Sequence, residues 1–354
     1  WSRRMAALPQ PVRDPGRLLA DLQAQVAANR LGEQELQRLI ARHGIREVLD
    51  GMEAVQRNAA EAVRSLIDRL QAGRHAVDLD DGCRIVVAVL PDHRQRRLRV
   101  DFSGTSPQQR GNLNAPLAIT KAVVLYVLRV LVARPIPLNA GCFEPIELIV
   151  PEGSLLSPTE PAAVVGGNVE TSQAVANALF GAFGVLAAGQ GTMNNLSFGN
   201  HRCQYYETVA GGSGAGLLPD GSGFAGCEAV QSHMTNSRLT DPEILEARFP
   251  VRLERFERRR GSGGAGRWRG GDGVVRLLRA TEPLTLAILS GSRLVPPFGL
   301  AGGGQGRCGR NAVLRADGRA EELGGSAQIA MEPGDAFLLA TPGGGGFGSP
   351  DAGG

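Results

Sequence analysis

The sequence predicts an α+β fold, in which a pair of helices precedes a mixed core and a glycine-rich, β-rich C-terminal part. Apolar residues recur at near-helical spacing over the first 72 residues, short alternating runs follow from Cys83, and glycine clusters separate the runs beyond residue 189. Helices followed by mixed elements and then strands favour α+β over a regular βαβ repeat. We therefore expect a helical region at 1–72, an α+β body at 73–350 that is mixed over 73–188 and β-rich over 189–350, and a flexible tail at 351–354.

Two amphipathic stretches predict the N-terminal helices. The first runs from Asp14 to about Arg42, with an expected break near Gly32, and the second runs from His43-Gly44 to about Gln71. The short connection between them favours an antiparallel pair.

Alternation, glycine and proline place the remaining elements. Two neighbouring strands should flank the Pro91-Asp92 turn, and helices are expected at 118–132 and 169–187. Further strands are predicted at 145–150, 249–258, 274–278, 284–289, 311–315 and 335–340. Residues 341–350 contain so much glycine that their composition indicates flexibility.

Composition excludes several classes of protein. The 354 residues are 42% hydrophobic and 21% charged, which suits a large core and excludes disorder and collagen. A net charge of +3 is too small for a nucleic-acid-binding face, and no apolar stretch approaches the roughly 20 residues of a membrane span. The five cysteines form no C-x-x-C pair, and the first residues lack a secretory signal, so we expect a cytoplasmic protein with reduced thiols.

Two familiar motifs are weak here. Residues 261–266 fit the spacing G-x-G-x-x-G, but another strand follows them, so we interpret them as a turn between strands. The single lysine, Lys121, lies between Thr120 and Ala122, which excludes a phosphate-binding P-loop. Zinc could in principle bind cysteine and histidine side chains between residues 201 and 233, but their spacing matches no known zinc motif, so core cysteines are the preferred interpretation.

Uncharged polar residues are unusually dense in glycine-rich surroundings between residues 166 and 236. Side-chain amides, hydroxyls, free backbone amides, an imidazole and carboxylates are the groups of an oxyanion and general acid/base site, although turn chemistry alone could explain part of the pattern. His233 is the preferred proton-transfer group because an imidazole titrates in the useful pH range, with a structural histidine as the alternative. Glu170 lies at a predicted helix N-terminus, where the dipole should lower its pKa and make it an acceptor rather than an acid.

Several segments together resemble the hydantoinase B/oxoprolinase family over about residues 17–350. They are the runs 101–116, 137–143, 151–156, 163–173, 190–195, 233–236 and 342–348, which occur in the family's order. The resemblance implies a subunit that opens a lactam or hydantoin ring together with a hydantoinase A-type partner, which has the sugar-kinase/actin ATPase fold and binds ATP. Related acetone and acetophenone carboxylases use the same module, so a ketone carboxylase subunit is an alternative.

Resemblance and chemistry together assign candidate roles. The candidate catalytic residues are His233, Asn168, Glu170 and Glu207, and the candidate substrate-binding residues are Thr192, Asn194, Asn195, Tyr206 and Asn236. Nothing in this sequence matches the N-terminal segment in which family members carry histidines and an aspartate that resemble metal ligands. We therefore expect a fragment whose divalent metal, in the complete protein, is held by residues outside this chain, or a truncated, non-catalytic assembly module.

Overall fold

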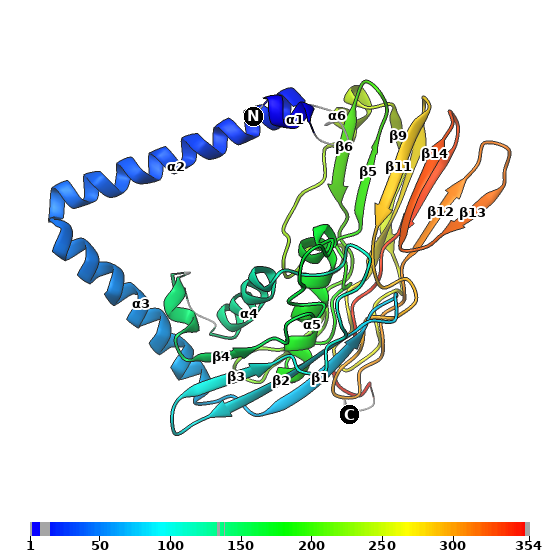
Figure 1. Ribbon diagram of the computed structural model, residues 1–354. Helices are drawn as coiled ribbons and strands as arrows, with labels where there is room; N and C mark the ends of the chain where they lie inside the picture. Colours follow the sequence, from blue (N-terminus) through cyan, green and yellow to red (C-terminus); the bar gives the residue numbers. More distant parts are fainter. Residues whose placement is uncertain (1, 8–14, 133–134, 138, 351–354) are drawn as a thin grey trace.

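The structure, a computed structural model, describes residues 2–7, 15–132, 135–137 and 139–350 and confirms the α+β fold (Figure 1). The tail predicted at 351–354 lies outside the described residues.

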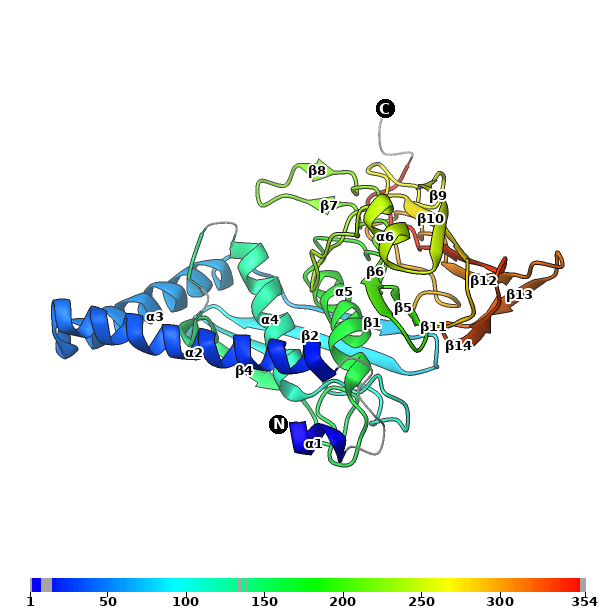
Figure 2. The same cartoon turned by 90° about the horizontal axis from the view of Figure 1, so that it is seen from above.

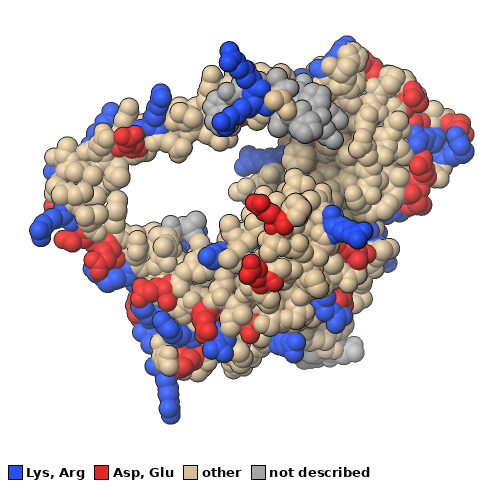
Figure 3. Space-filling model, viewed as in Figure 1, with Lys and Arg blue, Asp and Glu red and all other residues tan. Residues whose placement is uncertain are grey.

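A helical arm forms the N-terminal part. Helix α2 (Pro15–His43) and helix α3 (Ile45–Ile67) follow the short helix α1 (Ser2–Ala6). Helix α2 runs unbroken through Gly32, so the expected break there is wrong; the chain turns instead at Gly44, whose φ of 84° favours glycine. None of the described side chains of α2 is buried, and the arm encloses an open space beside the body (Figures 1 and 3).

A four-stranded sheet with the order β1-β2-β3-β4 forms the first half of the body. Its strands are β1 (Gly73–Asp78), β2 (Arg84–Asp92), β3 (Arg97–Asp101) and β4 (Ile146–Ile149), and only the β3–β4 pair is parallel. Helix α4 (Leu117–Val132) and helix α5 (Ser172–Phe183) pack with α3 and this sheet around one apolar core. The 3₁₀ turn η1 (Ala140–Phe143) contacts α3.

A β-sandwich forms the second half. One sheet has the order β14-β11-β5-β6, the other β13-β12-β15-β10-β9, and their alternate side chains meet in a second core. The first sheet contains β5 (Asn195–Gly199), β6 (Gln204–Thr208), β11 (Leu284–Leu289) and β14 (Ser326–Met331). The second contains β9 (Val251–Arg259), β10 (Gly273–Ala280), β12 (Arg310–Leu314), β13 (Ala320–Leu323) and β15 (Ala336–Ala340). Helix α6 (Pro242–Arg248) and a small hairpin of β7 (Gly216–Leu217) and β8 (Gly223–Phe224) complete the body (Figure 2).

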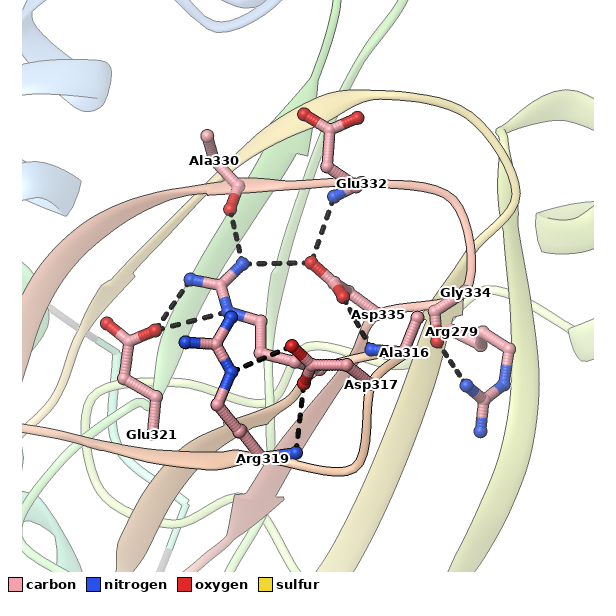
Figure 4. Close-up of polar contacts among 10 residues, drawn as sticks. Arg279, Ala316, Asp317, Arg319, Glu321, Ala330, Glu332, Gly334 and Asp335 are labelled. Carbon is pink, nitrogen blue, oxygen red and sulfur yellow. Dashed lines mark hydrogen bonds and ion pairs between the residues drawn. The ribbon is translucent and has the colours of Figure 1, made fainter.

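A buried aspartate fixes one end of the sandwich. Asp335 accepts hydrogen bonds from the backbone N–H groups of Ala316 (2.9 Å) and Glu332 (3.0 Å) and from Arg315 Nη1 (2.8 Å) (Figure 4). One carboxylate therefore joins the turn between β12 and β13 to the turn between β14 and β15.

Most of the glycine-rich segment at 341–350 is packed into the body, whereas its composition had indicated a flexible tail. Residues 341–347 are buried and run between other glycine-rich loops, where Gly344 N bonds Gly271 O (2.9 Å) and Gly346 N bonds Gly304 O (2.9 Å). A Cβ added to Gly344 would lie 1.9 Å from the carbonyl oxygen of Ser213, so only glycine permits this approach of main chains. Residues 261–266 belong to the same assembly, between β9 and β10, as the sequence predicts.

Candidate functional site

A cavity of about 630 Å³ lies where the β1-β2-β3-β4 sheet and α5 face the sandwich. Its wall comes from the turn between β1 and β2, the start of α5, the glycine loop at 188–191 and the loop at 289–298 that follows β11. Apolar residues such as Leu113, Val295 and Phe298 supply most of the exposed wall, and polar and charged residues such as Glu170 and Arg293 supply the rest. A largely apolar pocket with a few convergent polar groups is typical of a small-molecule site.

Glu170 is the acidic residue at the centre of this site. It belongs to a π-helical turn, Gly167–Thr171, that leads directly into α5. Gly167 is required there, since a Cβ would lie 2.4 Å from Asn114 O. Glu170 Oε1 accepts hydrogen bonds from Thr192 Oγ1 (2.8 Å), Met193 N (3.1 Å) and Asn195 Nδ2 (2.7 Å).

The other carboxylate oxygen of Glu170 has a different environment. Among the described residues, Oε2 accepts no hydrogen bond. This oxygen faces Gly291, and a Cβ added to that glycine would lie 3.2 Å from it. Burial raises the pKa of Glu170 to about 8, against the opposing effects of its three donors and Arg293. The expected lowering of this pKa by the helix dipole is therefore wrong, because desolvation outweighs it.

Arg293 is a functional candidate that the sequence analysis missed. Its Nη2 bonds Asn194 Oδ1 (2.7 Å) and Asn311 Oδ1 (3.1 Å), and its Nη1 bonds Gly291 O (2.6 Å). Burial lowers the pKa of Arg293 to about 10, so the guanidinium is still a cation at neutral pH. The only local signal was a polar run, residues 290–293, directly after an apolar strand.

Asn194 and Asn195 hold the side chains of Arg293 and Glu170. Asn194, with a φ of 48°, donates from Nδ2 to Gln190 Oε1 (2.8 Å), which leaves its Oδ1 to accept from Arg293. Asn195 Nδ2 also bonds Leu289 O (2.9 Å), and its Oδ1 accepts from the hydroxyl of Tyr206 (2.8 Å). The structure thus brings Thr192, Asn194, Asn195 and Tyr206 together with Glu170, with their side-chain hydrogen bonds directed at other protein groups.

His233 lies beside α5 rather than in the described cavity wall. Its Nε2 is 3.2 Å from Asn177 Oδ1 and its Nδ1 is 3.4 Å from the hydroxyl of Tyr126. Because Gly189 N already donates to Asn177 Oδ1, that oxygen is an acceptor, and Nε2 carries the proton. Burial lowers the pKa of His233 to about 4, so the ring is neutral at pH 7 and the expected titration in the neutral range is wrong.

Three further candidates are not brought to the cavity. Glu207 points into the sandwich, where Arg276 Nε and Nη2 donate to its two oxygens at 2.8 and 3.1 Å. Asn168 is exposed on the turn before α5, and Asn236 is exposed in the loop after His233.

The described residues contain no group of three or more His, Cys, Asp or Glu side chains able to hold a metal ion. None of the helices in the described ranges is long and apolar enough to cross a bilayer.

Comparisons with known proteins identify relatives over nearly the whole chain. 5-Oxoprolinase 1 of Arabidopsis thaliana is 46% identical over 348 residues, and 5-oxoprolinase of Dictyostelium discoideum is 43% identical over 343 residues. Each match covers 94% of this chain but 27% of the relative, so the chain spans about a quarter of their length. An ATP-dependent caprolactamase from Pseudomonas jessenii has the same fold, with a TM-score of 0.80 and 23% identity over 98% of this chain and 63% of that one. The family model described as hydantoinase B/oxoprolinase matches residues 3–350, and the chain belongs to this family.

Proposed function

We propose that this chain is part of an ATP-dependent enzyme that opens a cyclic amide, either a lactam or a hydantoin, with Glu170 as the general acid. The 5-oxoprolinase relatives and the similarity in fold to a caprolactamase support ring opening as the reaction. A hydantoinase A-type ATPase is the proposed partner, and the cytoplasm is the proposed location.

The environment of Glu170 is the observation that carries this proposal. Opening a cyclic amide breaks the bond between carbon and nitrogen, and the leaving nitrogen needs a proton. With a pKa of about 8, Glu170 is mostly protonated at pH 7. Three donors occupy Oε1, so the proton belongs on Oε2, the oxygen that faces Gly291 in the cavity wall.

Arg293 supplies positive charge beside this acid. A guanidinium in a dry pocket can stabilise the negative charge that develops on the carbonyl oxygen when water attacks. Its side-chain hydrogen bonds among the described residues end on uncharged oxygens, so no carboxylate contact neutralises it. Asn194 and Asn311 orient the guanidinium, and Thr192 and Asn195 orient Glu170.

The glycine-rich run 261–266 does not fit a nucleotide. Gly261 N and Gly263 N donate to Asp272, and Gly264 N donates to Gly344 O, so these amides are already used within the protein. We therefore assign ATP, which would supply the energy to make the amide carbonyl electrophilic, to the partner subunit. The described side chains offer no cluster of metal ligands, and the roles proposed for this chain are those of Glu170 and Arg293.

The test is ATP-dependent ring opening by this chain co-expressed with an A-type subunit and with the flanking sequence of its relatives, using 5-oxoproline and hydantoin in parallel. Glu170→Gln, which keeps the shape of the side chain, should lower kcat by about 100-fold or more, since general acids contribute 10²–10⁴-fold. Wild-type kcat should fall as the pH rises through about 8, where Glu170 loses its proton. The exposed Glu282→Gln serves as the control.

Near-normal turnover of Glu170→Gln would overturn the acid role. Carboxylation of acetone in place of ring opening would replace the proposed reaction, and activity of the assembly without this chain would favour a non-catalytic module.

A further inference from the structure

Asp80, in the turn between β1 and β2, binds a loop that is more than 200 residues away in the sequence. Its Oδ2 accepts a hydrogen bond from Arg293 N (2.7 Å), and its Oδ1 accepts from Leu294 N (3.0 Å) and Val295 N (2.8 Å). The carboxylate comes from the turn after β1, in the four-stranded half of the body, whereas the three amides follow β11 of the sandwich. Asp80 therefore bridges the two halves of the molecule at the cavity wall.

The loop that Asp80 binds is held in an unusual conformation. Ser292, directly before Arg293, has a φ of 54°, a backbone region that costs a side-chain-bearing residue about 1–2 kcal/mol. Such a conformation persists only where surrounding contacts over-determine it. The bonds from three consecutive amides to Asp80 and the bond from Gly309 N to Ser292 O (2.8 Å) provide those contacts.

The side chain of Arg293 extends from this anchored main chain. Its side chain binds only uncharged oxygens among the described residues, and each such bond is weaker than a bond to a carboxylate. We infer that Asp80 is a positioning residue of the proposed active site, which holds Arg293 where its charge acts on Glu170 and on the substrate. The catalytic part of this inference rests on the proposed function, but the effect of Asp80 on the pKa of Glu170 can be measured without catalysis.

The groups that face Glu170 make that effect measurable. Arg293, from the loop after β11, is the cation whose charge lowers the pKa of Glu170, and the Tyr206 phenol approaches from β6. The donors from residues 192–195 are uncharged. Displacing Arg293 should therefore raise the pKa of Glu170 further. If Asp80 only joined the two halves of the molecule, replacing it would leave that pKa unchanged.

The first experiment is a double-mutant cycle in the assembled complex with Asp80→Ala, Arg293→Ala and both together. Each single change should lower kcat by about 10- to 100-fold with a smaller change in KM, because misplacement by 1 Å can cost about 10²-fold. If Asp80 acts through Arg293, adding Asp80→Ala to Arg293→Ala should lower kcat by less than about twofold further. Independent, multiplying losses would overturn the inference.

Two matched variants control for folding. Asp92→Asn changes another aspartate that accepts turn amides, those of Arg94 (2.9 Å) and Gln95 (3.0 Å), outside the cavity wall, and should leave kcat unchanged. Asp80→Asn keeps the shape and can still accept hydrogen bonds on one oxygen, so it should retain part of the lost kcat and serves if Asp80→Ala does not fold.

The second experiment needs no substrate. The infrared band of the Glu170 carboxyl, identified by its loss in Glu170→Gln, is titrated in the wild type, Asp80→Asn and Asp92→Asn. A shift of the titration to higher pH in Asp80→Asn alone supports the inference even if the wild-type complex opens no cyclic amide, an outcome that would reject only the proposed function. If Asp80→Asn lowers the melting temperature but leaves the titration of Glu170 unchanged, Asp80 only stabilises the contact between the two halves, and the inference is overturned.

Discussion

Replacing Glu207 with glutamine should lower the free energy of unfolding by about 3–5 kcal/mol, the usual cost of removing one partner from a buried ion pair. The side chains of Glu207 and Arg276 are each 2% exposed, and two hydrogen bonds of 2.8 and 3.1 Å join them. Glutamine preserves the volume and one acceptor oxygen, but it leaves the guanidinium without a counter-charge. The ring of Phe256, whose centroid lies 5.3 Å from the guanidinium carbon, is worth only about 1 kcal/mol and is present in both forms, so it does not replace the carboxylate.

The assay is urea denaturation followed by circular dichroism, with Arg276→Met and the double variant completing a cycle. The double variant should lose less stability than the sum of the two single variants, because no unpaired charge remains in the core. Ring opening per folded molecule should be unchanged in Glu207→Gln. Full stability combined with lost activity would refute this reasoning and show that Glu207 is catalytic, as the sequence predicted.

Three further predictions concern the cavity and the glycine-rich loops. Gly344→Ala should lower the free energy of unfolding by about 3 kcal/mol or more, because its Cβ would lie 1.9 Å from Ser213 O. Gly32→Ala, which has open space around it in α2, should raise the free energy of unfolding by up to about 1 kcal/mol. Equal denaturation midpoints for the two variants would contradict both expectations. The stability of the wild type should fall relative to Glu170→Gln as the pH rises from about 4.5 to about 8, since folding raises this pKa; parallel stability curves would exclude a buried, protonated Glu170. His233→Asn, which suits the φ of 59°, should leave the pH–rate profile between 5 and 8 unchanged, and loss of an acid limb near pH 6–7 would restore the proton-transfer role.

The helices and the apolar strands were predictable because their periodicity is local. Helices α2, α3 and α4 and strands such as β10 and β11 lie close to the predicted ranges. Strands β5 and β6 were missed because their segments are rich in polar residues and glycine. That omission had a consequence for the site. Alternate residues of a strand face opposite sides, so Tyr206 lies next to Asn195 while Glu207 lies in the sandwich core.

Part of the site was also predictable from composition alone. The density of amides and hydroxyls around Glu170 indicated a polar centre, and the structure brings Thr192, Asn194 and Asn195 to it. Asp80 and Arg293 could not be paired from the sequence, since no local pattern relates residues so far apart. Burial, which decides the pKa of Glu170 and of His233, likewise depends on segments that meet only in the folded chain.

The buried run 342–347 also constrains the order of events during translation. It accepts or donates hydrogen bonds with residues at 188, 212, 215, 264, 268, 271, 300, 304 and 307, all of which leave the ribosome earlier. The amides of residues 212, 215, 264, 268 and 300 and the carbonyls of residues 188, 268, 271, 304 and 307 therefore lack these partners until residues 342–347 have emerged. The two apolar cores can begin to assemble before that moment, but the glycine-rich loops close around residues 342–347 only when these have been synthesised, so a nascent chain stalled just short of them should remain sensitive to proteases at those loops.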